Sequence, residues 1–218
     1  MAAHDVFVTG GTGYIGRALI MALHSRGHLV RALVRPESER KLPTGARAVE
    51  GDALDAGSFR DAIAPADTFV HLVGTPHPSP LKARQFRQVD LVSIRAAVAA
   101  ALHARVRHFV YLSVAHPAPI MAAYIAVRVE GEALLRASGI PATFVRPWYV
   151  VGPAHYWPLA VVPAYWVLER LPATREMATR LGLVTIEEIV AALVHAIEHA
   201  PRQLRKMNVQ DIRAVVSA

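Results

Sequence analysis

A run of glycines near the start of the chain, from Gly10 to Gly16, has the spacing of a turn that holds phosphate groups. The run satisfies both G-x-G-x-x-G and G-x-x-G-x-x-G. Glycine is needed because the chain turns sharply at positive φ, because a side chain would fill the space of a pyrophosphate, and because the next helix packs closely on the strand. That helix presents free N–H groups to the phosphates. The pattern predicts a dinucleotide site made by Gly10, Thr12, Gly13, Tyr14, Ile15 and Gly16.

Two arginines near this turn bear on which dinucleotide is bound. NAD-binding sites usually carry an acidic residue at the end of the second strand, where it bonds the ribose 2′-hydroxyl. The segment 30–35 contains no acid, but Arg17 follows the last glycine and Arg35 ends the segment. The planar guanidinium group is well shaped to clamp a 2′-phosphate. We therefore expect NADP(H) to be favoured over NAD(H); the alternative is that both arginines are solvated surface residues.

Short apolar segments alternate with longer amphipathic ones along the chain. Strands alternating with helices of ten or more residues predict βαβ units and a parallel sheet. Thr185, with acids in the turn after it, predicts the start of a further helix that reaches about His199. The predicted strands are 6–8, 29–34, 46–49, 68–73, 108–112 and 143–145, and the other predicted helices are 14–26, 55–64, 84–104 and 121–138.

The composition narrows the classes of protein. A chain of 218 residues, 53% hydrophobic and 19% charged, suits one folded domain. The sequence has no cysteine, which excludes disulfides, thiol catalysis and iron–sulfur clusters. The net charge is +7, but the arginines are scattered, so we expect no nucleic-acid partner. Residues 1–5 have no basic region and the apolar run 6–8 is too short for a signal peptide, so we expect a cytoplasmic protein.

An ordered series of motifs resembles the extended and atypical branches of the short-chain dehydrogenase/reductase superfamily, over roughly residues 5–200. The series is TGGTGYIG at 9–16, Gly51-Asp52, VHLVG at 70–74, VYLS at 110–113, Tyr124-x-x-x-Arg128, Val145-Arg146-Pro147 and Gly152-Pro153. The resemblance implies an α/β fold, a Rossmann-like doubly wound parallel sheet with a small C-terminal substrate-side region. It implies a single NAD(P)-binding domain over 1–218, in which 148–184 form a substrate-side or lid insertion.

The resemblance also adds residues to the cofactor site. In the superfamily the aspartate that matches Asp52 bonds the adenine amino group, and the end of the fourth strand lines the adenosine and ribose. The added cofactor-binding residues are Asp52, Ala53, Val73, Gly74, Thr75 and Pro147.

The tyrosine that matches Tyr124 is the superfamily's general acid/base. Its partner four residues on, here Arg128, bonds the nicotinamide ribose and lowers the tyrosine pKa. This spacing puts both residues on one helix face, and a phenol with an ordinary pKa near 10 needs a neighbouring cation to work near neutrality. The chain departs from the superfamily twice: the partner is usually lysine, and the usual catalytic serine falls near Ala115. Ser113 is the candidate to face the nicotinamide, with His116 or Thr75 as alternative donors.

Two functions follow from this comparison. The leading hypothesis is an NADP(H)-dependent oxidoreductase or epimerase-type enzyme that acts on a small apolar carbonyl or alcohol through Tyr124. The alternative is a catalytically weak NADP(H)-binding sensor or scaffold, because the chain also resembles the regulator-type and respiratory-complex accessory members of the superfamily. The retained Tyr124 favours the first, and Arg128 and the missing serine favour the second.

An aromatic stretch without charged residues lies between Arg146 and Glu169 and contains all three tryptophans. Its prolines argue against one membrane-spanning helix. We expect a pocket wall or lid for an apolar small-molecule substrate; the alternatives are a peripheral membrane or protein contact through 148–168, and plain core packing.

One motif is rejected. His195-Ala196-Ile197-Glu198-His199 matches the H-x-x-E-H pattern of zinc proteases. A zinc site needs a third ligand, usually a carboxylate further on, and Asp211 is the only acid after His199. We therefore expect no metal site.

Overall fold

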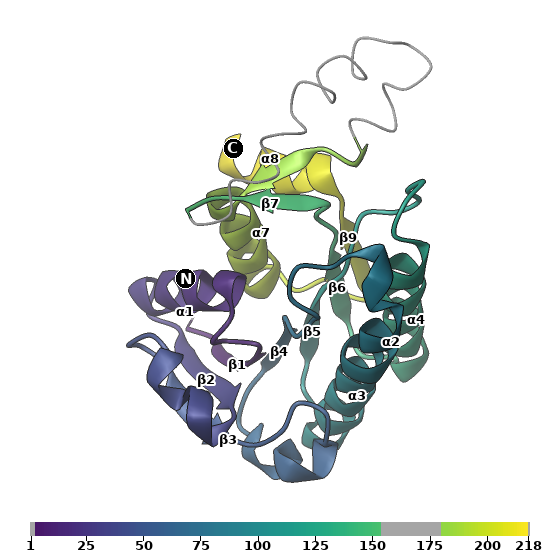
Figure 1. The fold of residues 1–218 in the computed structure, drawn as a ribbon. Coiled ribbons are helices and arrows are strands. Elements are labelled where there is room, and N and C mark those ends of the chain that lie inside the picture. Colours follow the sequence, from purple (N-terminus) through teal and green to yellow (C-terminus); the bar gives the residue numbers. More distant parts are fainter. Residues whose placement is uncertain (1–2, 154–179, 218) are drawn as a thin grey trace.

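The computed structural model describes residues 3–153 and 180–217. Within them, one sheet of seven parallel strands has the order β3-β2-β1-β4-β5-β6-β9 (Figure 1). This is the Rossmann-like doubly wound arrangement that the sequence predicts. The strands are β1 (Asp5–Thr9), β2 (Leu29–Val34), β3 (Arg47–Glu50), β4 (Thr68–His71), β5 (His108–Leu112), β6 (Ala142–Val145) and β9 (Leu204–Met207).

Helices cover both faces of the sheet (Figure 1). On one face lie α1 (Tyr14–Ser25), α7 (Ile186–Glu198) and α8 (Val209–Ser217), and on the other α3 (Val92–Ala104) and α4 (Ala122–Ser138). The chain runs from β1 outward to β3 and then crosses back to β4, which pairs with the other side of β1. A crevice at such a reversal is where open α/β sheets bind their ligands.

Alternation along the strands divides the core in two. Val6 and Val8 of β1 belong to a valine-side core with α1, α7 and α8, in which Val70, Val110 and Val145 also take part. Phe7, between them, belongs to a phenylalanine-side core with α3 and α4, and this core contains all six phenylalanines of the chain. Neighbouring strands stack these rings, so that the centroids of Phe69 and Phe109 lie 5.0 Å apart. Both cores hold the strand ends in register beneath the crevice.

The prediction of a helix over 55–64 is wrong. The structure has two short 3-10 turns there, Ala56–Ser58 and Arg60–Ala62. The Asp55 carboxylate accepts a hydrogen bond from the Gly57 N–H at 2.9 Å, and this local bond competes with helical pairing. Phe59, with φ −141°, separates the two turns and buries its ring in the phenylalanine-side core. Burial of the Phe59 ring therefore stabilises the segment more than a continuous helix would.

The region predicted as one helix over 84–104 is helical but irregular. A 3-10 turn (Pro80–Lys82), α2 (Ala83–Gln85) and a π-helical segment (Phe86–Leu91) precede α3. The π-helical segment contains the buried Asp90, and such segments are frequent at functional sites. The strands β7 (Tyr149–Val151), β8 (Leu183–Thr185) and β9 and the helix α8 were not predicted.

Strands β7 and β8 pair in parallel as a small second sheet. β7 lies within the segment 148–184 that the sequence predicts as a substrate-side or lid insertion, and β8 lies at its end. Most of that segment, and of the stretch 148–168, lies outside the described residues, so both interpretations stay predictions. Among residues 3–153 and 180–217, no helix has the length and apolar character that crossing a membrane requires.

Candidate functional site

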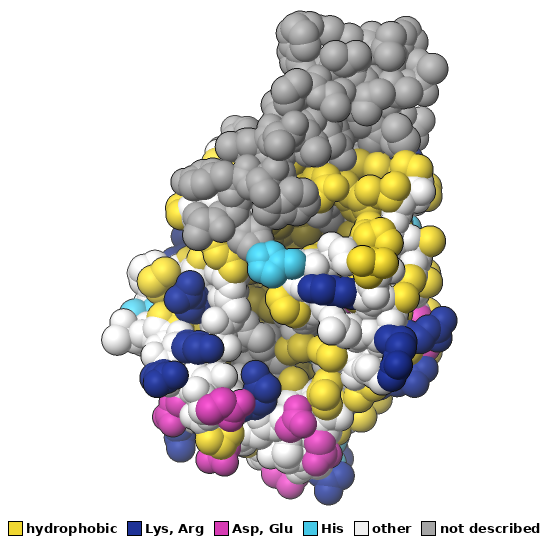
Figure 2. Space-filling model, in the orientation of Figure 1, with side chains coloured by type: hydrophobic (Ala, Val, Ile, Leu, Met, Phe, Trp, Pro, Cys, Tyr) yellow, Lys and Arg dark blue, Asp and Glu magenta, His cyan; other side chains and the backbone are white. Residues whose placement is uncertain are grey.

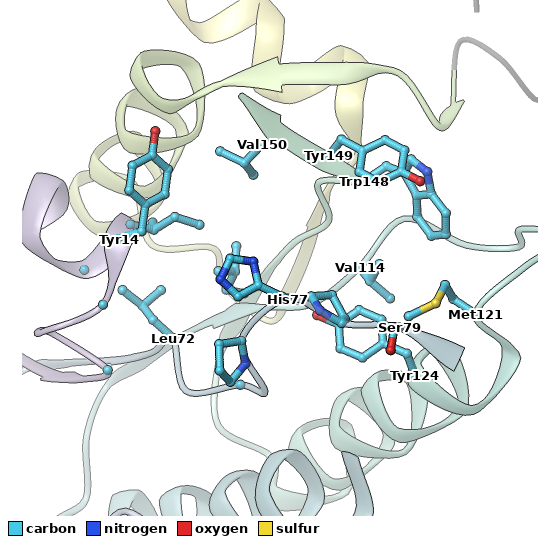
Figure 3. Close-up of a pocket in the computed structure, with 18 of the residues that line it drawn as sticks. Tyr14, Leu72, His77, Ser79, Val114, Met121, Tyr124, Trp148, Tyr149 and Val150 are labelled. Atoms are coloured by element: carbon cyan, nitrogen blue, oxygen red, sulfur yellow. The ribbon is translucent and has the colours of Figure 1, made fainter. Parts of the chain in front are cut away.

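A cavity of about 630 Å³ lies at the carboxyl ends of β1, β4, β5 and β6. The molecule is hollowed at this place (Figure 2), and side chains from the segments that follow β4, β5 and β6 and from α4 point into the hollow (Figure 3). The glycine turn, including Tyr14 and Ile15, forms one wall. Tyr124 of α4 and Met121, the residue before this helix, lie on the opposite side, with Trp148 and Tyr149 above them (Figure 3). The cavity therefore joins the predicted phosphate site to the predicted proton donor.

The glycines of the turn serve different needs. Gly10 has a φ of +81°, which only glycine adopts without strain. A Cβ on Gly16 would collide with the carbonyl oxygen of Gly10, so Gly16 permits close packing of helix on strand. Gly13 has an extended backbone, and a Cβ there would meet only the Gly10 oxygen, at 3.2 Å. The backbone conformation does not require glycine at Gly13, and the one tight contact of a side chain there would be with the Gly10 oxygen. Room for a pyrophosphate stays the predicted reason for this glycine.

The N-terminus of α1 supports the same interpretation. Gly13 is its N-cap, no side chain caps the first turn, and no acid lies in it. The first N–H groups of a helix need partners from outside the helix. Here they stand at the cavity wall formed by residues 13–16, where a phosphate fits them.

Tyr124 and Arg128 share one face of α4, as their spacing predicts. The guanidinium carbon of Arg128 lies 5.1 Å from the ring centroid of Tyr124 and 5.8 Å from that of Tyr111. The Tyr124 ring also packs against Phe86, with centroids 5.0 Å apart. The phenol therefore faces the cavity from a rigid setting with a cation beneath it.

Arg128 is almost fully buried, and its guanidinium group has protein partners. It donates to the Asp90 carboxylate at 2.7 Å and to the Leu112 carbonyl at 3.0 Å. Burial opposes its charge, but Tyr124, Tyr111 and Asp90 outweigh this effect and raise its pKa above the ordinary value. The arginine is thus a fixed cation at this site.

Asp90 is a site residue that the sequence analysis missed. Its side chain is completely buried and accepts from Arg128, from the Thr75 N–H at 3.0 Å and from the Thr75 hydroxyl at 2.6 Å. One carboxylate therefore ties α4 to the loop after β4. The only signal in the sequence is an acid within an otherwise apolar and basic helical pattern. The Thr75 hydroxyl, an alternative substrate donor in the sequence analysis, is engaged in this bond.

Ser113 lies apart from Tyr124. Its hydroxyl donates to the buried Glu132 carboxylate at 2.7 Å, and Ser113 is not among the residues that line the cavity. Val114 lines the cavity instead. Glu132 also accepts two hydrogen bonds from Arg146. Burial alone would raise the pKa of Glu132, but the bonds from Arg146 and Ser113 lower it below its ordinary value.

The other alternative donor, His116, is also absent from the cavity wall. It is half-buried, and burial together with the nearby Arg146 lowers its pKa.

The loop after β4, residues 76–80, lines the cavity and carries His77 and Ser79. His77 has a φ of 48°, unusual outside glycine, and its ring lies centrally in the cavity (Figure 3). Neither residue was predicted from the sequence.

The residues predicted to hold the adenosine half follow the ends of β2, β3 and β4. Arg35 directly follows β2, its side chain is 68% exposed, and its Nε lies 3.2 Å from the Glu37 carboxylate. Arg17 is also exposed. The Asp52 carboxylate accepts from the Leu54 N–H at 2.9 Å. Of the predicted site residues, Thr12, Arg17, Arg35, Asp52, Ala53, Val73, Thr75, Ser113, Arg128 and Pro147 do not line the cavity.

The rejected zinc motif has a structural use. The rings of His195 and His199 stack with centroids 4.3 Å apart, and the Glu198 carboxylate binds Arg26 and His28. Among the residues that the structure describes, no three His, Cys, Asp or Glu side chains cluster as metal ligands would.

Comparison with known proteins adds to this geometry. A family model described as NAD(P)H-binding matches residues 10–153. The chain is 29% identical over 168 residues to the 4-hydroxy-2-methyl-3-oxo-4-farnesyl-3,4-dihydroquinoline-1-oxide ketoreductase of Stigmatella aurantiaca, covering 67% of this chain and 50% of that protein. It is 29% identical over 194 residues to the ceramide reductase of Caulobacter vibrioides, covering 87% and 59%. The chain thus spans about half the length of the curated relatives it matches.

Solved structures share the fold. The Bordetella bronchiseptica enzyme WbmH, in complex with NAD+, superposes with a TM-score of 0.71 at 21% identity, covering 99% of this chain and 82% of that one. A short-chain dehydrogenase/reductase superfamily protein from Agrobacterium tumefaciens, with bound NAD, superposes with a TM-score of 0.68 at 18% identity, covering 98% and 82%. Because the family model matches residues 10–153, about two thirds of the chain, we conclude that the chain belongs to the NAD(P)H-binding family, with the fold of these NAD-bound enzymes.

Proposed function

We propose that this chain is an NADP(H)-dependent oxidoreductase or epimerase-type enzyme for a small apolar carbonyl or alcohol. The observation that carries the proposal is the single cavity that joins the glycine turn to Tyr124. Its substrate side is formed largely by apolar and aromatic side chains, among them Val114, Ile120 and Trp148. Two relatives are named for a farnesyl-bearing ketone and for a ceramide, which agrees with an apolar substrate.

In this proposal the protein holds the reactants and moves one proton. Gly10, Gly13 and the start of α1 would hold the pyrophosphate, and the nicotinamide, when bound, would supply or accept the hydride. Tyr124 donates its phenolic proton to the carbonyl oxygen during reduction and takes it back during oxidation. Arg128 stabilises the resulting phenolate by its charge, from beneath the ring. Ser113 is not part of this mechanism because its hydroxyl is bound to Glu132.

The cofactor preference is the second part of the proposal. Arg35, at the end of β2, and Arg17, after the last glycine, are the cations available for a 2′-phosphate. We expect NADPH to bind more tightly than NADH, with a margin that shrinks as salt screens the arginine–phosphate pairs. Titration calorimetry at low and high salt measures this margin, with Arg35→Gln as the variant and the exposed Arg60→Gln as control. Equal affinities in the native protein would remove both arginines from this role.

The decisive experiment is Tyr124→Phe, assayed by NADPH oxidation with a panel of apolar ketones, aldehydes and quinones. The substitution removes the proton donor but keeps the ring between Phe86 and Arg128. Turnover should fall about 10²–10⁴-fold, as expected for loss of general acid catalysis. NADPH affinity should stay the same, because the phosphate contacts lie across the cavity. Unchanged turnover would contradict the role of Tyr124.

A second candidate function is a catalytically weak NADP(H)-binding sensor or scaffold. The specific observation that favours it is that Arg128, which replaces the usual lysine, is hydrogen-bonded to Asp90, and that Ser113, the candidate for the missing serine, is hydrogen-bonded to Glu132. If the native protein binds NADPH tightly but oxidises none of it with any compound of the panel, the proposal of a sensor or scaffold replaces that of an enzyme.

A further inference from the structure

The mouth of the cavity carries exposed apolar side chains. Leu81 is 96% exposed and directly follows Pro80, which lines the cavity. Ile120 lines the cavity and is nevertheless 52% exposed. The 3-10 turn Pro80–Lys82 packs against α4, which begins just after Ile120, so both residues lie at one opening. We call Leu81, Ile120, Arg84 and Arg87 the mouth surface.

The charge of this surface has one sign. The segment 74–89 contains Lys82, Arg84 and Arg87 and no acid, and 112–127 contains no charged residue at all. Arg84 and Arg87 are exposed, three and six residues after Leu81 in the same helical run. Arg128, the first charged residue of α4, is buried and paired with Asp90, so it adds no exposed charge to this surface. In Figure 2 apolar and basic side chains adjoin the hollow, while most visible acidic side chains lie at the lower end.

We propose that the mouth surface docks on an anionic lipid bilayer. A nearly fully exposed leucine beside cations and without carboxylates matches an interface in which apolar side chains enter the acyl boundary and basic ones meet anionic headgroups. Because the same surface opens into the cavity, an apolar compound dissolved in the bilayer reaches Tyr124 without crossing water. This docking is a property separate from catalysis, and it goes beyond the proposed function.

Sedimentation of the full chain with large vesicles tests the proposal. Vesicles of phosphatidylcholine with phosphatidylglycerol should bind the protein, vesicles of phosphatidylcholine alone should bind it much less, and added salt should weaken binding. Leu81→Asp and Ile120→Asp should each lower partitioning about tenfold or more. Arg84→Gln and Arg87→Gln should each lower it about fivefold.

Leu29→Asp is the matched control, since Leu29 is 65% exposed but lies at the amino end of β2, away from the cavity. It should bind vesicles as the native protein does. Absence of vesicle binding, or equal loss in Leu29→Asp and Leu81→Asp, would overturn the proposal. The proposal would also be overturned if the native protein self-associates, Leu81→Asp abolishes this self-association, and vesicle binding of the variant persists. The mouth surface would then contact a second copy of the chain and not a bilayer. The vesicle experiment measures binding and not turnover, so its outcome does not depend on the outcome of the Tyr124→Phe experiment.

Discussion

Gly13 and Gly16 belong to one turn but are glycine for different reasons. A side chain on Gly16 would strike the backbone of Gly10, so its substitution damages the fold. Gly13 has φ −75° and ψ 173°, which any residue adopts, and open space on its cavity side. The backbone conformation at Gly13 therefore tolerates a side chain, at the cost of one tight contact with the Gly10 oxygen, and we expect its main constraint to be the ligand.

Gly13→Val should abolish NADPH binding and cost only about 1 kcal/mol of stability, the difference between glycine and valine as an N-cap. Calorimetry and urea unfolding measure the two effects. Gly27→Ala is the converse control, because Gly27 has φ +81° and lies remote from the cavity. Its free energy of unfolding should fall by about 1 kcal/mol, while its affinity for NADPH should stay that of the native protein. Native affinity in Gly13→Val would refute the phosphate site.

For individual residues, the sequence predicts contacts within one helix or strand better than contacts between elements. The facing of Tyr124 and Arg128 follows from helical spacing alone, and it is confirmed. The pairing of Ser113 with Glu132 joins the end of β5 to α4, and no local pattern encodes it. Asp90 was missed for the same reason, because its partners lie in two other elements.

The helix α7 shows how local sequence determines an element boundary. Thr185 accepts from the Glu188 N–H at 3.2 Å, and the Glu188 carboxylate accepts from the Thr185 N–H at 2.7 Å. The two reciprocal bonds form a capping box, and the sequence prediction that Thr185 begins this helix is confirmed. Over 55–64 the same kind of local reasoning failed, because burial of Phe59 decided the conformation.

Thr185→Ala should lower the free energy of unfolding by about 1 kcal/mol, within the usual 0.5–2 kcal/mol for an N-cap. Urea denaturation measures the change. Thr44→Ala serves as control, since Thr44 is exposed in the loop before β3 and should give a change below about 0.5 kcal/mol. Equal effects of the two substitutions would mean that the cap contributes nothing beyond an average exposed threonine.

For the molecule as a whole, several histidines are buried in the neutral form. Burial, assisted by Arg128, lowers the pKa of His71 to about 3, and burial lowers that of His108 to about 4. His71 lies between the Thr9 hydroxyl, at 2.8 Å, and Ser93. In the unfolded chain both titrate near 6.5 and bind protons more readily than in the folded protein. Stability from these groups is therefore complete above pH 6.5 and is lost as the pH falls toward 3–4.

Between pH 7 and pH 5 each of the two histidines should remove about 2 kcal/mol from the free energy of unfolding. Glu132 and Glu198, with lowered pKa values, keep their contribution in this interval and lose it only below 4.5. Urea unfolding at both pH values should show a fall that is about 2 kcal/mol smaller in His71→Gln, although that variant is less stable at pH 7. The exposed His103→Gln should keep the full fall. An undiminished fall in His71→Gln would contradict a neutral buried His71.

The two cores also become available at different moments of synthesis. The described members of the phenylalanine-side core end at Phe144, so all are present once about two thirds of the chain has been made. The valine-side core requires Met207 and Ile212 as well. At about 5–20 residues per second the interval lasts about 3–14 seconds. During that time the apolar face of α1 has no α7 or α8 to cover it, and on the ribosome this is the side of the nascent chain that chaperones must shield.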